Sequence, residues 1–209
     1  MTTRLQRGCA VLLAAGFCAA AAADPVEMQD RQQLADGLFR RSLFELAARE
    51  YASLAEKPDA SGLDNVLFRL GECYRRMKKG AEAEAVYKRL VETFPASPNA
   101  PRAQLQRALI LMEAGGGSLE HAVASFEKLA AAGVPADVRA AALYHWAESL
   151  EKLNRPAEAL ARYERLGAEF ADTDYGMYAG LRTAWLLTRT GKAEDRRRED
   201  ERDLGRRVV

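Results

Sequence analysis

The chain has few of the residues that build metal sites and disulfide frameworks. Its 209 residues include only two histidines and three cysteines. His121 and His145 lie far apart, and neither has a second His or Cys three or four residues away, as a zinc-binding helix would need. Cys9 and Cys18 fall in the first 23 residues, which leaves Cys73 as the one thiol of the remaining chain. We therefore predict no metal site and no internal disulfide.

Aromatic residues are also sparse, and neither sign of charge dominates. Aromatics make up 8% of the chain, whereas alanine is abundant, a balance that favours closely packed helices over strands. The 31 basic and 30 acidic residues nearly cancel. Such a chain has no overall positive field to attract nucleic acid or an anionic membrane surface. The composition predicts a mostly α-helical protein that does not bind nucleic acid.

The one long apolar run lies at the N-terminus. Arg4 and Arg7 precede the uncharged, alanine-rich segment 8–23, which ends in three small residues before Asp24. A basic start, a short apolar stretch and small residues at a cleavage point are typical of a secretory signal peptide. We predict that residues 1–23 are a signal peptide and that the mature protein is exported.

Two other uses of this run stay open. It has about 16 residues, fewer than the roughly 20 that a membrane-spanning helix needs, so an uncleaved N-terminal anchor is the less favoured alternative. Cys18 could instead carry a lipid anchor, although Phe17 stands where lipidation sites normally have a small residue. After signal cleavage we expect no integral membrane span.

The rest of the chain repeats a pattern of paired helices. In each pair, a small residue and an aromatic or leucine three residues later mark a first helix, and an Ala, an aromatic and a Leu mark a second. Small residues let two helices approach closely while aromatics fill the space around them. The first-helix marks are Ala35 and Leu38, Gly71 and Tyr74, Ala108 and Leu111, and Ala147 and Leu150. The second-helix marks are Ala47, Tyr51 and Leu54; Ala83, Tyr87 and Leu90; Ala122, Phe126 and Leu129; and Ala159, Tyr163 and Leu166.

Helix-breaking residues separate these pairs. The second-helix alanines are 36, 39 and 37 residues apart, and the longest interval contains an insertion, Gly115–Gly117, at the turn between two helices. Short turns between pairs are expected to stop one helix and cap the next. These turns are 58–60, 95–97, 134–136 and 171–173. No longer linker divides the chain, so we expect one cooperative superhelix from about residue 27 to about residue 190.

The pattern stops after Leu187. Residues 178–187 form a fifth first helix, but segment 196–203 has no apolar residue that could make a second helix to pair with it. We therefore expect the fifth helix to leave an apolar edge at the end of the array. We divide the mature chain into a repeat array, 24–190, and a charged tail, 191–209, which is either a charged helix or disordered.

These spacings resemble the tetratricopeptide repeat (TPR). The resemblance implies an all-α, TPR-like α-solenoid, a right-handed superhelix of antiparallel helix pairs with about four repeats plus an additional helix. It also implies a surface that binds other proteins, because TPR first helices line a concave groove that suits an extended peptide or a helix.

Catalytic motifs are absent from the sequence. It has no Walker loop, GxSxG elbow, HExxH motif or glycine-rich dinucleotide turn. Cys73 has no histidine in its repeat to act as a base, so we expect a small hydrophobic residue at the margin of the helix packing, with a redox or intermolecular disulfide role as the alternative. We expect both histidines to be solvated or locally hydrogen-bonded. The sequence predicts no enzyme, no catalytic residue and no cofactor.

The family's inner-face positions give the candidate binding residues. Projected onto this sequence, they mix aromatic residues with charges of both signs, which suits apolar anchors and charge-assisted bonds to a partner. Some, such as Phe68, Leu105 and Leu181, could instead pack in the core. The full set is Asn65, Phe68, Glu72, Arg75 and Arg76; Arg102, Leu105, Leu109 and Met112; Tyr144, Glu148, Glu151 and Lys152; and Tyr178, Leu181 and Trp185. The preferred partner-binding candidates are Phe68, Glu72, Arg75, Arg76, Leu109, Tyr144, Glu148, Tyr178 and Trp185.

A finer likeness concerns the connection between pairs. Segment 94–103 reads Phe-Pro-Ala-Ser-Pro-Asn-Ala-Pro-Arg-Ala, and segment 170–175 is a weaker copy. This connection resembles exported bacterial TPR proteins of the Tol-Pal coordinator type and the outer-membrane assembly lipoprotein type. The resemblance implies a non-catalytic adaptor in the periplasm that binds a protein in an envelope complex. The alternative is an accessory subunit of an enzyme that acts on peptidoglycan or polysaccharide.

Overall fold

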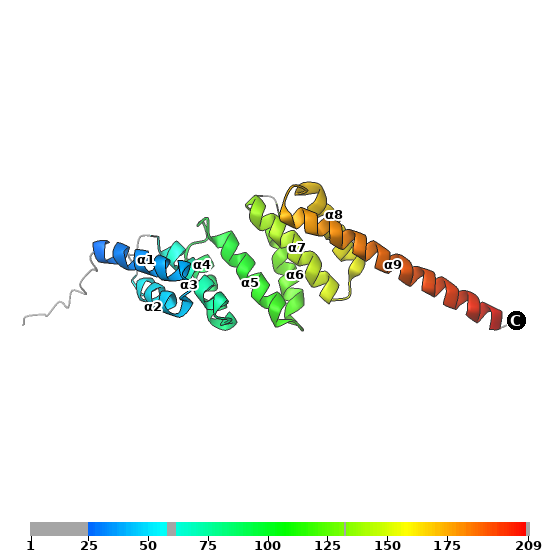
Figure 1. Cartoon of the computed structure of the whole chain (residues 1–209), viewed down its shortest axis with the longest axis horizontal. Coiled ribbons are helices and arrows are strands. Elements are labelled where there is room, and N and C mark those ends of the chain that lie inside the picture. Colours follow the sequence, from blue (N-terminus) through cyan, green and yellow to red (C-terminus); the bar gives the residue numbers. More distant parts are fainter. Residues whose placement is uncertain (1–24, 58–61, 132, 208–209) are drawn as a thin grey trace, which may run out of the picture.

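The computed structural model describes residues 25–57, 62–131 and 133–207 of the chain. These residues form nine α-helices and no strand (Figure 1). The helices are α1 (Pro25–Arg40), α2 (Phe44–Ala55), α3 (Leu63–Arg76), α4 (Gly80–Thr93), α5 (Ala100–Ala114), α6 (Ser118–Leu129), α7 (Ala136–Lys152), α8 (Pro156–Glu169) and α9 (Asp174–Arg207). The predicted all-α fold class is confirmed.

Each helix packs against the next helix along the chain. Short turns reverse the direction between α1 and α2, and the same arrangement recurs from α3 to α8 (Figure 1). The result is an elongated array of antiparallel helix pairs, with α1 at one end and α9 at the other. The sequence predicted these four pairs and an additional helix.

The repeated alanines, aromatics and leucines of the second helices form the centres of the pairs. Ala83, Tyr87 and Leu90 are completely buried, and their counterparts in the other three second helices are at most 3% exposed. Gly71 has a more specific role than general close packing. A Cβ atom at this position would lie 2.4 Å from the ring of Tyr87, so the missing side chain makes room for that ring.

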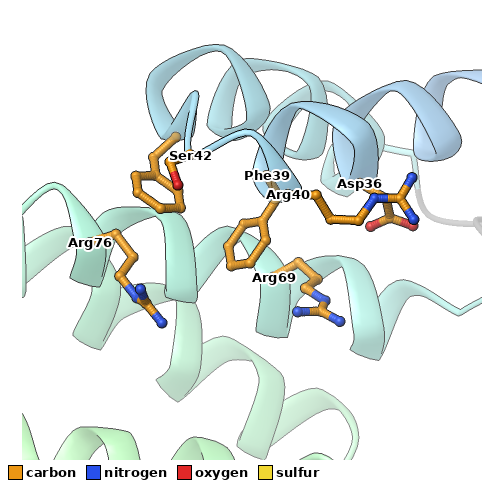
Figure 2. Close-up of a pocket in the computed structure, with 7 residues that line it drawn as sticks. Asp36, Phe39, Arg40, Ser42, Arg69 and Arg76 are labelled. Atoms are coloured by element: carbon orange, nitrogen blue, oxygen red, sulfur yellow. The ribbon is translucent and has the colours of Figure 1, made fainter.

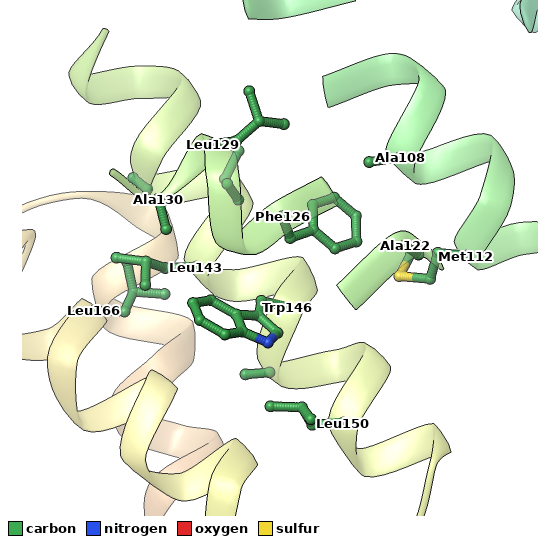
Figure 3. Packing of buried hydrophobic residues seen from close by; sticks show 14 of the residues in the cluster. Ala108, Met112, Ala122, Phe126, Leu129, Ala130, Leu143, Trp146, Leu150 and Leu166 are labelled. Atoms are coloured by element: carbon green, nitrogen blue, oxygen red, sulfur yellow. The ribbon is translucent and has the colours of Figure 1, made fainter. Parts of the chain in front are cut away.

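The buried hydrophobic residues form two clusters instead of one continuous core. Helix α5 belongs to both, because Ala100 and Ala103 pack with the N-terminal cluster and Ala108 and Met112 with the C-terminal one. Figure 3 shows the C-terminal cluster, with the rings of Phe126 and Trp146 among smaller side chains. The predicted array therefore has two cores, which meet at α5.

The predicted glycine turn is present, whereas most of the predicted helix caps that the structure describes are not. Gly115 and Gly116 connect α5 to α6 with φ angles of 69° and 54°, in the left-handed region that favours glycine. Among the expected capping connections that the structure describes, only the one before α9 caps its helix with a side chain, since the Thr173 hydroxyl accepts a hydrogen bond from the Gly176 N–H at 3.1 Å. Helices α2 to α8 have no side-chain cap, so that expectation is wrong for segments 95–97 and 134–136.

Segments 95–97 and 134–136 lack a side-chain cap for different reasons. The N-cap position of α7 is occupied by Pro135, which has no side-chain acceptor. Ser97 lies two residues before the N-cap residue of α5, and its hydroxyl donates to the carboxylate of Asp64 at 2.5 Å. Segment 58–60, the other proposed connection, lies outside the described residues.

Helix α9 continues far beyond the array. It has 34 residues and runs without a break through most of the predicted charged tail (Figure 1). Of the two states proposed for the tail, the structure shows a helix as far as Arg207. The boundary at residue 190 therefore separates two parts of one helix. No described helix combines the length and the apolar character that a membrane span requires. The predicted signal peptide, 1–23, lies outside the described residues.

Candidate partner-binding surface

A tyrosine of the second helix donates a hydrogen bond to an acid of the first helix in three of the four pairs. The Tyr87 hydroxyl bonds Glu72 at 3.0 Å, the Tyr163 hydroxyl bonds Glu151 at 2.8 Å, and the Tyr51 hydroxyl bonds Asp36. A phenol buried in a helix interface needs such an acceptor. Burial and the neighbouring carboxylate both raise the pKa of each phenol well above its ordinary value. The hydroxyls therefore remain protonated donors.

The third pair has neither partner of this bond. Phe126 replaces the tyrosine, and Leu109 occupies the position that corresponds to Glu72, one residue after the small residue of the first helix. Leu109 is half-buried against the C-terminal cluster. The repeats thus change both partners together, from tyrosine and acid to two apolar residues. Comparison of the repeats in the sequence could have shown that Glu72 and Leu109 face the partner helix of their own pair.

Two further candidates in α3 are occupied within the chain. The half-buried ring of Phe68 lies with its centre 5.9 Å from that of Tyr87. Arg75 donates to both carboxylate oxygens of Glu113, at 3.1 and 3.0 Å, and so ties α3 to α5. A two-pronged bond of this kind holds both side chains in one geometry. Phe68 and Arg75 therefore contribute to the packing between helices of this chain.

The candidates of α7, Tyr144 and Glu148, lie in or beside a cluster of aromatic rings. Tyr144 lies within 6.4 Å, centre to centre, of four rings, those of His145, Tyr163, Tyr175 and Tyr178. Glu148 lies 2.7 Å from Nδ1 of His145, which confirms that this histidine is locally hydrogen-bonded.

The position of Glu148 affects its ionisation. Burial favours the neutral acid, but the bond with His145 and the cations Lys152 and Arg182 outweigh it, so the pKa of Glu148 is lower than usual. Glu148 is therefore ionised at neutral pH, and its charge is already compensated within the chain.

Three of the preferred candidates remain exposed: Arg76, Tyr178 and Trp185. The last two belong to one surface. Tyr178, Leu181 and Trp185 follow the spacing i, i+3, i+7 on α9, which places them on one face of the helix, and we call this set the α9 stripe. Their exposed fractions are 56%, 70% and 44%. Leu181, for which the sequence left a core position open, is a surface residue.

The indole of Trp185 is flanked by two guanidinium groups of its own helix. Arg182 lies 4.7 Å and Arg189 5.2 Å from the ring centre. Arg182 is itself fixed, because it donates to both oxygens of Glu151, which also accepts the Tyr163 hydroxyl. Contacts of this type between cations and aromatic faces are attractive. The orientation of Trp185 is thus coupled to the core of the fourth pair.

Large exposed hydrophobic residues gather at the two ends of the described chain. Those of the C-terminal end are the α9 stripe with Met177 beside it and Leu187 on another flank of the helix. The others are in α1, α2 and the turn between them, and none is in α3 to α8. Met177 and Leu187 were not among the projected inner-face positions. Leu105 and Met112, which were, are buried in the core at 9% exposure.

The remaining reactive side chains do not form a site. Cys73 is completely buried and deeper than the packing margin we expected, and its burial raises the pKa of its thiol to about 12. His121 is exposed at the start of α6. Within the part of the chain that the structure describes, no three His, Cys, Asp or Glu side chains gather as metal ligands would.

Comparison with known proteins identifies the repeat and the fold. The tetratricopeptide repeat model matches residues 65–97 and 141–173, which lie within the α3–α4 and α7–α8 pairs and the turns after them. A comparison with curated proteins gave no match. The chain is similar to the crystal structure of a Podosopora anserina protein described as a kinesin light chain with nearly identical TPR-like repeats. The TM-score is 0.61 and the identity 14%, over 86% of this chain and 94% of that one.

A second similar structure is a double mutant of MamA RS-1. Its TM-score is 0.57 and its identity 15%, over 84% of this chain and 99% of that chain. Identities this low speak for the fold alone. Helix pairs, repeat signature and structural likeness agree: the chain is an all-α, tetratricopeptide-like solenoid, a fold that generally mediates interactions between proteins.

Proposed function

We propose that this protein is a non-catalytic adaptor of the bacterial cell envelope that binds a helix or peptide of a partner protein at the C-terminal end of its array. The observation that carries the proposal is the exposed α9 stripe. Large exposed hydrophobic side chains that share one face of a helix are typical of an interaction site.

The packing of α9 indicates what the stripe binds. The first helices α1, α3, α5 and α7 each pack against a second helix that follows them in the chain. Helix α9 packs against α8 and α7, and no later helix follows it among the described residues. An amphipathic helix with apolar residues at i, i+3, i+4 and i+7 would cover the stripe as a second helix covers a first.

The charge of Arg189, next to the stripe, would restrict the choice of partner. Arg189 is exposed beside Trp185, and no acid of the described chain pairs with it through a salt bridge. A partner helix with acidic residues next to its apolar face would match this edge. Six preferred candidates are half-buried against other parts of the chain, so the proposal moves the binding centre from the middle of the concave groove towards α9.

The envelope location rests on the amino-acid sequence. The basic and apolar start of the chain supports export, and the Phe-Pro-Ala-Ser connection supports a place among periplasmic TPR proteins. A mature N-terminus at Asp24 in protein isolated from the native cell would support this location. An N-terminus at Met1 would contradict signal cleavage.

Affinity capture tests the binding proposal. The full chain, expressed in its native cell with a C-terminal tag, should retain one or a few proteins, and Leu181→Glu should reduce their recovery at least about tenfold because it places a charge in the apolar contact. Ala161→Glu is the matched control, because Ala161 is exposed on α8 and lies outside the stripe. Equal recovery by the two variants would contradict the proposal.

The same capture separates the proposal from its alternative. An accessory subunit of an enzyme should bring down a catalytic partner together with activity on peptidoglycan or polysaccharide. An adaptor should bring down proteins without such activity.

A further inference from the structure

A second polar and aromatic feature lies at the opposite end of the array from the α9 stripe. A cavity of about 380 Å³ opens between the turn that joins α1 to α2 and one side of α3 (Figure 2). Its walls are Asp36, Phe39, Arg40, Ser42, Phe44, Arg69 and Arg76. We call it the N-terminal pocket. Of its residues, only Arg76 was a candidate from the sequence.

The pocket has an excess of positive charge. Three guanidinium groups, from Arg40, Arg69 and Arg76, line it, whereas most other arginines before residue 192 have a carboxylate within salt-bridge distance. No such pair involves any of these three within the described chain. The one acid in the pocket, Asp36, already accepts the hydroxyl of Tyr51. Three cations therefore line a pocket that has one carboxylate, and that carboxylate is already bonded to Tyr51.

The aromatic walls hold two of these cations in place. Phe39 and Phe44 meet edge to face, with centres 5.4 Å apart. Arg69 lies 5.2 Å above the ring of Phe39, and Arg76 lies 5.9 Å from that of Phe44. Figure 2 shows the Phe39 ring between the two α3 arginines. A guanidinium group that contacts a ring in this way keeps N–H donors for a ligand, and no carboxylate of the described chain lies within salt-bridge distance of these two.

The start of α2 adds to this field. Phe44 is the first residue of α2, so the positive end of that helix dipole lies at the rim of the pocket. The arginines, the dipole and the rings together favour a ligand that is anionic in one part and apolar in the next.

We propose that the N-terminal pocket binds an acidic segment of a polypeptide, with two carboxylates on Arg40, Arg69 and Arg76 and an adjacent apolar side chain against Phe39 and Phe44. The fork of a guanidinium matches a carboxylate through two parallel bonds. This proposal extends the proposed function, because it gives the array a second contact with a protein partner, far from the α9 stripe.

The size and surroundings of the pocket favour a peptide over a polynucleotide. Its volume suits a few side chains, and its aromatic walls need an apolar group to cover them. The chain as a whole carries 31 basic and 30 acidic residues, so its net charge gives no overall positive field to attract a nucleic-acid backbone.

Fluorescence anisotropy of a labelled hexapeptide of alternating Glu and Phe tests the proposal on the full chain. We expect saturable binding that weakens about tenfold in Arg76→Ala, since one charge-assisted contact is lost. Arg41→Ala makes the same change of charge at an exposed neighbour outside the pocket, and it should change affinity less than about twofold. Arg69→Gln, with its folding checked by circular dichroism, should weaken binding as Arg76→Ala does.

Three results would overturn the proposal. One is equal binding of a peptide in which Gln replaces every Glu, because the carboxylates would then be irrelevant. Another is displacement of the peptide by inorganic phosphate at the peptide's own concentration, which would indicate a simple anion site. The third is tighter, Arg76-dependent binding of a single-stranded oligonucleotide. Leu181→Glu should leave peptide affinity unchanged, so failure at this pocket and failure at the α9 stripe are distinguishable.

Discussion

Arg182 of α9 donates to both carboxylate oxygens of Glu151 of α7, at 3.2 and 2.6 Å. Glu151 also accepts the hydroxyl of the buried Tyr163, and Arg182 lies against the exposed Trp185. One carboxylate therefore connects the interior of the fourth pair to the surface that we assign to partner binding. The additional helix is attached to the array by this bond as well as by apolar packing.

Loss of this carboxylate should destabilise the C-terminal half of the array. We expect Glu151→Ala to lower the free energy of unfolding by about 2 kcal/mol, because a buried phenol and a guanidinium lose their acceptor together. Glu164→Ala, at an exposed position of α8, is the control and should stay within about 0.5 kcal/mol of the parent. Urea denaturation followed by circular dichroism measures both values. Equal free energies of unfolding for the two variants would contradict the stabilising role of Glu151.

The third pair indicates how the tyrosine and acid pairs can be replaced. Glu72→Leu alone should cost about 1–3 kcal/mol, because it leaves the hydroxyl of Tyr87 buried without its acceptor. Glu72→Leu with Tyr87→Phe reproduces the apolar combination of Leu109 and Phe126, and it should recover most of that loss. A double-mutant cycle in urea gives the coupling between the two sites. Strictly additive effects would disprove the pairing.

Cys73 should be unreactive in the folded protein. It is completely buried, and the pKa of its thiol is raised to about 12, so the thiolate that attacks a disulfide reagent is scarce at pH 8. Cys9→Ser and Cys18→Ser remove the other thiols. We then expect reaction with Ellman's reagent to proceed only as the chain unfolds in urea. Immediate reaction in buffer would contradict this burial and would restore a redox role for Cys73.

The raised pKa of Cys73 also implies a loss of stability in base. The folded state holds the proton more tightly than the unfolded state, whose thiol titrates near about 8.5. The contribution of this group is therefore complete below that pH and decreases as the pH rises towards 12. Cys73→Ala should remove this part of the pH dependence between about pH 8.5 and 10. Parallel stability profiles of parent and variant would contradict it.

The sequence predicted the helix pairs well because their signals are local. An alanine, an aromatic and a leucine at helical spacing identify a packing face wherever they recur, and all four second-helix sets are buried. The insertion at Gly115–Gly117 was equally readable, since glycine adopts positive φ angles without strain.

The sequence predicted individual surface residues less well. Glu72, Arg75 and Glu148 occupy inner-face positions of the repeat, but each has an intramolecular partner that lies on another helix or one turn away. The bonds of Glu72 and Arg75 depend on distances between helices, which the period of a pattern does not give, whereas His145 and Glu148 are three residues apart on one helix, a spacing that the sequence shows. For Glu72, the available signal was the aligned change from Tyr87 and Glu72 to Phe126 and Leu109.

The N-terminal pocket was missed for a similar reason. Arg40 and Arg69 belong to different helices 29 residues apart, and each alone is typical of a solvated helix face. Only the turn after α1 brings them to one cavity with Phe39 and Phe44. The division into two clusters at α5 was not predicted, because the small and apolar marks of the repeat continue on both sides of this helix.

The central claim is that the α9 stripe is covered by a partner protein in the native envelope. Photo-crosslinking from p-benzoylphenylalanine placed at position 181 tests it most directly, with the same residue at position 161 on α8 as the matched control. We predict one or a few discrete adducts from position 181 and none of them from position 161. No adduct at 181, or the same adducts from both positions, would contradict the account.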